Sequence, residues 1–300
     1  MYITQPPYLQ KGDQVAITCP AKKLPKPMDD AIALLNSWGL EVVLGETVTA
    51  EHHQFAGTDE LRAADLSRFL ADKNIKAIFA ARGGYGTIRM IDEVDFMPVK
   101  TAPKWVIGFS DITVLHAHLF SVFGLQSIHG QMPLTIPDGT SASLQTLRKA
   151  LFGEDFGYHF SAEKLNREGE AQGILTGGNL ALLVAVSGSV SDFNYDGKIL
   201  FLEDVGEYLY NIDRLMRTLK RARKLKNLAG LMIGGLTELK DNDIPFGQTA
   251  EEIIFEVVKE YDYPVCFNFP AGHIANNQAL VFGKILNLTV QKQHVTATYL

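Results

Sequence analysis

The sequence predicts a two-domain α/β protein, in which a doubly wound parallel sheet domain is followed by a smaller, strand-rich α/β domain. A chain of 300 residues is long enough to build two hydrophobic cores. Residues 13–130 alternate apolar strand patterns with amphipathic helix patterns, which is typical of parallel strands joined by right-handed crossovers. Residues 174–300 contain both kinds of pattern without that regular alternation.

The elements of the first domain, residues 1–151, follow from short apolar runs and from helical periodicity. The predicted helix at 28–38 ends at Gly39, and the helix that follows Ser110 ends at Gly124. The other predicted helices are 58–73 and 87–94, and the predicted strands are 14–19, 41–44, 77–81, the run that ends at Gly108, and 126–129.

A predicted linker separates this domain from the second, which spans residues 174–300. Residues 152–173 are polar, contain glycines and show no clear periodicity, so we expect a linker there. Beyond it, the same patterns predict helices at 178–187, 212–222 and 249–260, and strands at 198–202, 228–233, 265–269, 280–290 and 294–299.

Composition and charge argue against several classes of protein. The chain is 46% hydrophobic, and its dispersed charges sum to −6, so no basic face for nucleic acid is expected. No apolar run is long enough to cross a membrane, and the first residues lack the pattern of a secretory signal. Cys19 and Cys266 are too few for a disulfide framework. We therefore expect a cytoplasmic protein with buried free thiols.

Ser110 lies at the turn between an apolar strand and an amphipathic helix. Such a turn holds the serine above the carboxyl edge of the sheet, beside the first N–H groups of the helix. This environment suits a nucleophile, because the oxyanion that forms meets backbone donors and the positive end of the helix dipole. Taken alone, however, a serine at this position is more typical of a simple helix cap.

A serine nucleophile needs a base to take its proton and an acid to orient that base. Glu203 directly follows the predicted strand 198–202, and His273 follows the apolar run that begins at Pro264. Each residue alone is equally explained as a solvated strand end or an ordinary loop histidine.

A series of short motifs runs in order along nearly the whole chain. The most specific are RGGYG at 82–86 and GFSD at 108–111; the others lie at 9–17, 128–130, 177–180, 202–204, 210–214 and 272–273. Together they resemble the LD-carboxypeptidase family (peptidase family S66), which includes the muramoyl-tetrapeptide carboxypeptidases and the microcin C immunity peptidases.

The resemblance implies a flavodoxin-like N-terminal domain, a smaller strand-rich C-terminal domain and an active site between them. It also implies a Ser-Glu-His triad, with Ser110 as nucleophile, His273 as general base and Glu203 as the orienting acid. The implied enzyme is a serine carboxypeptidase that releases the terminal D-alanine from murein tetrapeptides in peptidoglycan recycling. No cofactor is expected, and the sequence has no zinc or calcium ligand spacing.

The predicted oxyanion hole pairs the backbone N–H of Asp111 with an N–H of the Gly83–Gly84 turn, which we assign to Gly84. Glycines let the backbone approach a substrate carbonyl closely and adopt unusual dihedral angles. The same turn could open a phosphate loop, which would make the chain a flavodoxin-like phosphate-binding protein. It lacks both the G-x-G-x-x-G spacing and a following Lys-Ser/Thr.

The sequence leaves the substrate partly open. Arg82 and Arg214 are the candidates for binding the terminal carboxylate of a small peptide, and neither a nucleic acid nor a membrane is an expected partner. An immunity-type enzyme that cleaves peptidyl or aminoacyl nucleotides is the alternative within the family. Its extra aromatic loop has no obvious counterpart here, because Trp38 and Trp105 both fall in predicted core elements. Whether the protein forms a homodimer is left open.

The chain departs from the family pattern at two places, of which the first is a mild change and the second bears on the loop near His273 and so on substrate preference. Ser189 follows Gly188 where the family usually has threonine, and no proline stands before Gly283.

Overall fold

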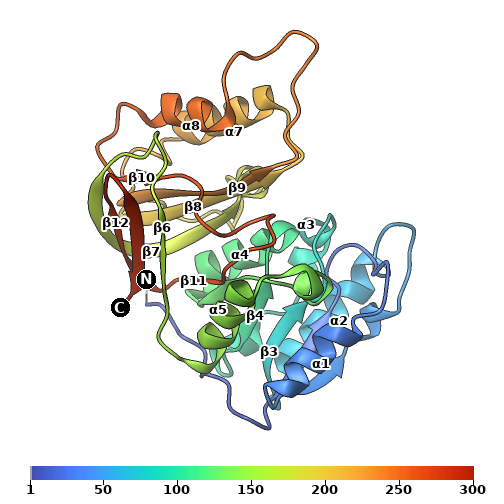
Figure 1. Cartoon of the computed structure of the whole chain (residues 1–300). Coiled ribbons are helices and arrows are strands. Elements are labelled where there is room, and N and C mark those ends of the chain that lie inside the picture. Colours follow the sequence, from blue (N-terminus) through green and yellow to red (C-terminus); the bar gives the residue numbers. More distant parts are fainter. Residues whose placement is uncertain (1) are drawn as a thin grey trace.

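The computed structural model describes residues 2–300 and has two lobes, each built around one sheet (Figure 1). The lobe drawn in blue to green holds a six-stranded sheet, and the lobe drawn in yellow to red holds a seven-stranded sheet. The predicted fold class, a doubly wound parallel sheet followed by a strand-rich α/β region, is confirmed.

The five predicted strands of the first sheet are parallel neighbours in the order β5-β4-β3-β1-β2. The crossovers that leave β1 and β3 run in opposite directions, so the carboxyl ends of these two strands flank the switch point at which such sheets bind ligands. The elements of this lobe are β1 (Gln14–Thr18), α1 (Asp29–Ser37), β2 (Glu41–Leu44), α2 (Asp59–Ala71), β3 (Ile75–Ala80), α3 (Thr87–Met90), β4 (Trp105–Gly108), α4 (Thr113–Phe123), β5 (Ser127–His129) and α5 (Ser141–Phe152).

Helix α5 is absent from the prediction, although its signals are visible in the sequence. The Thr140 hydroxyl caps the helix by accepting a hydrogen bond from the Ser143 N–H at 3.2 Å. Leu147 and Leu151, one turn apart, are buried in the core. Gly153 ends the helix in the left-handed conformation, with a φ of 75°.

The sixth strand of the first sheet, β11 (Leu280–Phe282), comes from the far end of the sequence and corrects the predicted strand at 280–290. It pairs antiparallel with β5, so that Leu280 faces His129. Gly283 then turns the chain at a φ of 88°, and β12 (Ile285–Val290) continues in the other sheet. The apolar pattern continues on both sides of this glycine, so the sequence predicted one strand where the structure has two strands in different sheets.

The second sheet has the order β10-β9-β8-β7-β12-β13-β6, with its first four strands parallel and the rest antiparallel. The remaining elements are β6 (Gly157–Ser161), β7 (Gly169–Asn179), α6 (Leu180–Ala185), β8 (Lys198–Val205), α7 (Leu209–Arg221), β9 (Gly230–Thr237), α8 (Ala250–Val258), β10 (Val265–Cys266) and β13 (His294–Tyr299).

The predicted linker at 152–173 is largely wrong, because β6 and the first half of β7 lie within it. β6 is an edge strand in which only Tyr158 is fully buried. The first half of β7 alternates half-buried with exposed residues. Antiparallel strands with one solvent-exposed face contain few consecutive apolar residues, so their sequences resemble those of loops.

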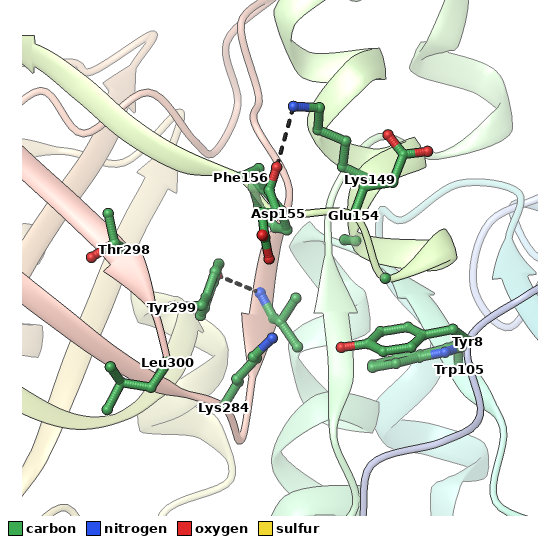
Figure 2. Close-up of a pocket in the computed structure, with 13 residues that line it drawn as sticks. Tyr8, Trp105, Lys149, Glu154, Asp155, Phe156, Lys284, Thr298, Tyr299 and Leu300 are labelled. Carbon is green, nitrogen blue, oxygen red and sulfur yellow. Dashed lines mark hydrogen bonds between the residues drawn. The ribbon is translucent and has the colours of Figure 1, made fainter.

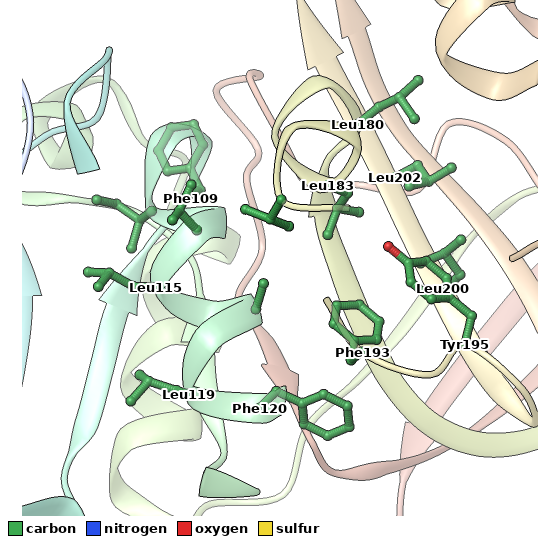
Figure 3. Packing of buried hydrophobic residues seen from close by; sticks show 14 of the residues in the cluster. Phe109, Leu115, Leu119, Phe120, Leu180, Leu183, Phe193, Tyr195, Leu200 and Leu202 are labelled. Carbon is green, nitrogen blue, oxygen red and sulfur yellow. The ribbon is translucent and has the colours of Figure 1, made fainter. Parts of the chain in front are cut away.

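The two lobes share one apolar core (Figure 3). Leu115 and Phe120 of α4 belong to the same buried cluster as Leu183 of α6 and Leu200 of β8. Phe120 also meets the Phe193 ring edge to face, with centroids 5.5 Å apart. This shared core fixes the helix that follows Ser110 relative to the strand that carries Glu203.

Within residues 2–300, no helix combines the length and the apolar character needed to span a membrane.

Candidate active site

Ser110 occupies a strained turn between β4 and α4. Its φ of 63° places a residue other than glycine in the left-handed region, which costs about 1–3 kcal/mol. A 3-10 turn at Ser110–Ile112 leads into α4, and the N-cap residues of the two helical segments are Phe109 and Ile112. Neither cap uses a side-chain hydrogen bond. The strained backbone is therefore not explained by helix capping, and it is typical of a nucleophile elbow.

Glu203 and His273 form a hydrogen-bonded pair in which Glu203 is buried and His273 is half-buried. Glu203 lies inside β8, rather than just after a strand, and its side chain is 0% exposed. Its Oε2 atom accepts hydrogen bonds from His273 Nδ1 at 2.5 Å and from the His273 backbone N–H at 3.2 Å. Gly272 makes this approach possible, since a Cβ at that position would lie 2.8 Å from the Glu203 Cβ.

The Glu203 carboxylate controls the protonation of His273. Burial alone would lower the pKa of His273. The hydrogen bond that His273 donates to Glu203 and the nearby charges of Glu203, Asp204 and Glu238 outweigh burial, so the pKa is raised. Because Nδ1 is bonded to Glu203, the other ring nitrogen, Nε2, is left for acid–base chemistry.

His273 lies beside the Ser110 turn. Its ring meets the Phe109 ring edge to face, with centroids 4.9 Å apart. Within residues 2–300, no hydrogen bond joins His273 to Ser110 itself. Catalytic hydrogen bonds are often long in the absence of substrate and tighten when it binds.

Asp204, next to Glu203, holds the ends of two strands together. Its carboxylate accepts hydrogen bonds from Asn179 Nδ2 at 2.9 Å, from the Ala181 N–H at 3.0 Å and from the Val205 N–H at 2.9 Å. Burial and the Glu203 charge raise the pKa of Asp204 to about 6. Sequence reasoning did not single out Asp204, although it is the second carboxylate of the 202–204 motif.

The glycine turn at 82–86 lies directly against the serine. A Cβ placed on Gly83 would be 3.2 Å from Ser110 Oγ and 3.3 Å from the Asp111 backbone nitrogen. The space beside the Ser110 hydroxyl is therefore open only because Gly83 has no side chain. This is where the predicted oxyanion hole requires room for a substrate oxygen.

Buried polar side chains hold this turn in place. Arg62 of α2 is 0% exposed and donates to the carbonyl oxygens of Pro20 at 2.6 Å and Gly86 at 2.9 Å, and it pairs with Asp59. Asp111 Oδ2 accepts from the Thr87 N–H at 2.8 Å. A signal for Arg62 was present in the sequence, because it falls on the apolar stripe of its predicted helix.

The two arginines proposed to bind substrate lie in different places. Arg82 is close to the turn, but its guanidinium donates to the carbonyls of Lys23 at 3.0 Å and Gly83 at 3.3 Å. Arg214 is exposed on α7 and donates to Asn211 Oδ1 at 2.9 Å through Nε. Arg82 thus begins the glycine turn beside Ser110, with its guanidinium bound to backbone carbonyls. Arg214 makes no contact with the Glu203–His273 pair.

A separate cavity of about 460 Å³ lies at the opposite end of β4 (Figure 2). Trp105, at the amino end of that strand, lines it together with Tyr8, Lys284 and Tyr299, whereas Ser110 follows the carboxyl end. Ligands of doubly wound sheets bind at the carboxyl end. The described residues contain no group of three or more His, Cys, Asp or Glu placed to hold a metal ion.

Comparison with known families and proteins gives consistent matches over most of the chain. The family models for the LD-carboxypeptidase N-terminal domain and C-terminal domain match residues 15–130 and 172–288. The "Probable murein peptide carboxypeptidase" of Bacillus subtilis is 34% identical over 289 residues, which cover 93% of this chain and 89% of that protein. The "Murein tetrapeptide carboxypeptidase" of Pseudomonas aeruginosa is 30% identical, with 90% and 91% covered.

Solved structures share the fold. Muramoyltetrapeptide carboxypeptidase from Oxalobacter formigenes superposes with a TM-score of 0.86 at 26% identity, covering 95% of this chain and 98% of that one. The microcin immunity protein MccF in complex with glutamyl sulfamoyl guanosine gives a TM-score of 0.87 at 19% identity, with 98% of each chain covered.

Proposed function

This chain belongs to the LD-carboxypeptidase family, and on that premise we propose that it is a serine carboxypeptidase that releases the terminal D-alanine from murein tetrapeptides. The observation that carries the proposal is the hydrogen bond between His273 and the buried Glu203 carboxylate, with the histidine against the strained turn that holds Ser110. The names of the relatives from Bacillus subtilis and Pseudomonas aeruginosa support the substrate class.

In the proposed reaction, Ser110 Oγ attacks the carbonyl carbon of the amide that joins D-alanine to the peptide. His273 Nε2 takes the hydroxyl proton, and the buried Glu203 carboxylate stabilises the imidazolium that results. The N–H groups of Asp111 and Gly84 bind the oxyanion. His273 then gives the proton to the leaving amine, so that D-alanine departs and an acyl-enzyme remains. A water molecule, deprotonated by His273, releases the shortened peptide and restores Ser110.

The proposal includes a role in peptidoglycan recycling in the cytoplasm. Cys19 and Cys266 support this location, because both are free thiols, the state that a reducing compartment maintains.

The immunity-type alternative receives less support. The likeness to MccF, at 19% identity, is a likeness of fold. Trp105 is 1% exposed and donates from Nε1 to the Pro7 carbonyl at 2.9 Å, so its ring is not free to stack on a base. Trp38 is half-buried and packs against the core of the first lobe.

The test is to incubate the purified protein with murein tetrapeptide and, separately, with an aminoacyl sulfamoyl-adenosine, and to quantify the D-alanine or amino acid released. We expect release of D-alanine that disappears in Ser110→Ala and persists in the control Ser141→Ala, which changes an exposed serine on α5. Activity on the nucleotide analogue alone would favour the immunity-type reading. Activity of Ser110→Ala close to that of the wild type would contradict the mechanism.

A further inference from the structure

We propose that Lys22 binds the terminal carboxylate of the substrate and so restricts the enzyme to free carboxyl termini. The inference rests on the proposed function, because a carboxypeptidase must recognise the terminal carboxylate close to its scissile bond, and a cation binds a carboxylate through a charge-assisted hydrogen bond. With a net charge of −6, the chain does not attract anions over long range, and a local positive group must do so.

Lys22 lies at the switch point of the first sheet. The turn that follows β1 carries Lys22, and the turn that follows β3 carries Gly83 and Gly84. These two strands are adjacent in the sheet, and Ser110 follows the next strand, β4. The carboxyl ends of β1, β3 and β4 therefore set the lysine, the glycine turn and the serine side by side along one edge.

Close contacts connect the three positions. A Cβ built on Gly84 would lie 2.6 Å from Lys22 Cδ and 2.8 Å from Lys22 Cγ, so the lysine stem packs directly on this glycine. On the other side of the turn, a Cβ built on Gly83 would lie 3.0 Å from Ser110 Cβ. Two glycines without side chains thus separate the lysine from the nucleophile.

The charge of Lys22 acts on the same site. Burial raises the pKa of Asp111, the residue after Ser110, and the Lys22 ammonium is one of the groups that oppose this rise. The Lys22 charge therefore acts at the residue that follows the proposed nucleophile.

The spacing fits the chemistry of a terminal residue. Adjacent Cα atoms of a peptide are about 3.8 Å apart, so the carboxylate of the leaving residue lies one residue step beyond the carbonyl that Ser110 attacks. If that carbonyl oxygen enters the space beside Gly83, the carboxylate lies near Gly84. A lysine carries three donors on a flexible stem, which lets it follow the carboxylate at this distance.

The other cations around this edge are already engaged. Arg62 is buried and donates to backbone carbonyls, and so does Arg82. Lys23 and Arg89 are each paired with a carboxylate, at 2.7 Å and 2.6 Å. The half-buried Lys22 ammonium, by contrast, makes no hydrogen bond or ion pair with any residue in 2–300.

The experiment compares two substrates in three variants of the full chain. The substrates are the murein tetrapeptide with a free terminal D-alanine and the same peptide ending in D-alanine amide. The variants are Lys22→Met, Lys22→Arg and the matched control Lys23→Met, which changes the neighbouring lysine. Melting temperatures verify that each variant folds, and kcat/KM is measured for both substrates.

We expect Lys22→Met to lower kcat/KM for the free acid by about 10- to 100-fold, the value of a hydrogen bond between charged groups, mostly through KM. The amide should be cleaved as slowly as by the wild type, so the preference for the acid collapses. Lys22→Arg should restore much of this preference, and Lys23→Met should keep it.

Three outcomes separate the hypotheses. A Lys22→Met variant that keeps the wild-type preference for the free acid overturns the role of Lys22 and leaves the proposed function standing. Equal loss on acid and amide assigns Lys22 a structural role and overturns the inference as well. A wild-type protein that cleaves neither peptide refutes the proposed function, and the inference falls with it.

Discussion

Replacing Glu203 by glutamine tests the electrostatic part of the proposed triad. Glu203 Oε2 accepts both the Nδ1 hydrogen and the backbone N–H of His273, whereas Oε1 has no hydrogen-bond partner within residues 2–300. A glutamine will therefore direct its oxygen toward His273 and its amide group to the unpartnered side. The ring keeps its orientation and tautomer, and only the negative charge is lost.

The expected loss can be worked out from that charge. An imidazolium and a carboxylate about 4 Å apart attract each other by about 4 kcal/mol at an effective permittivity of 20. Above the pKa of His273 the imidazolium forms only along the reaction path, so this energy stabilises the transition state. Glu203→Gln should lower kcat by about 10³-fold while the unfolding midpoint changes little.

The pH dependence has a definite sign. The base must be neutral, so activity is present above the pKa of His273 and is lost as the pH falls through it. Burial lowers this pKa, and the Glu203 hydrogen bond and charge raise it. Glu203→Gln removes the negative charge of Glu203, whereas burial and the charges of Asp204 and Glu238 remain. The pKa of His273 therefore falls, and the acid limb of kcat/KM must move to lower pH.

The assay is D-alanine release from the tetrapeptide over a range of pH, for wild type, Glu203→Gln and the control Glu238→Gln. Glu238 is exposed and acts on the pKa of His273 through its charge only, so its variant should show a small shift in the same direction and an unchanged plateau. An unchanged plateau and an unmoved acid limb in Glu203→Gln would refute the assignment of His273 as the base oriented by Glu203.

Four further predictions concern the surroundings of the pair. Ser110→Gly should abolish hydrolysis. It should also raise the free energy of unfolding by about 1 kcal/mol, because glycine adopts a φ of 63° without strain. A loss of stability in denaturant titration would argue against backbone strain at Ser110. Gly83→Ala should lower kcat by about 10²-fold, as loss of an oxyanion donor does, since its methyl group would sit 3.2 Å from Ser110 Oγ; a wild-type kcat would place the oxyanion elsewhere. The pKa of Asp204 is raised from 3.8 to about 6 in the folded protein, so protonated Asp204 favours folding below pH 4, and this contribution is lost as the pH rises to about 6. Asp204→Asn should therefore flatten the dependence of stability on pH in this window, as followed by thermal unfolding. EDTA should leave the rate unchanged, because the described residues contain no metal-ligand cluster, and inhibition reversed by zinc would contradict this.

The sequence predicted those parts of the fold and site that depend on local pattern. Buried parallel strands are continuous apolar runs, and Gly39 and Gly124 mark the ends of two helices, so the five parallel strands of the first sheet could be predicted directly. The turn at Ser110 was visible because a strand pattern stops there and a helix pattern begins. Glu203 and His273 were found because each ends or follows an apolar run, although their pairing came from the family resemblance.

What the sequence did not reveal depends on partners far along the chain. β6 and the first half of β7 have one exposed face, and their identity as strands comes from pairing with β13 and β12. Lys22 resembles any surface lysine until the turns after β1 and β3 are placed side by side. The burial of Arg62 depends likewise on two turns from other strands converging on it.

The pairing of β11 with β5 makes the proposed site depend on residues near the end of the chain. The loop that carries His273 follows β10 of the second sheet and precedes β11 of the first sheet, so its two ends are fixed in different sheets. Ser110 is translated more than a hundred and fifty residues before β11. A nascent or truncated first half would expose the hydrogen-bonding edge of β5, which favours aggregation, and would lack the proposed base, His273. If the proposed mechanism holds, neither half is active without the other.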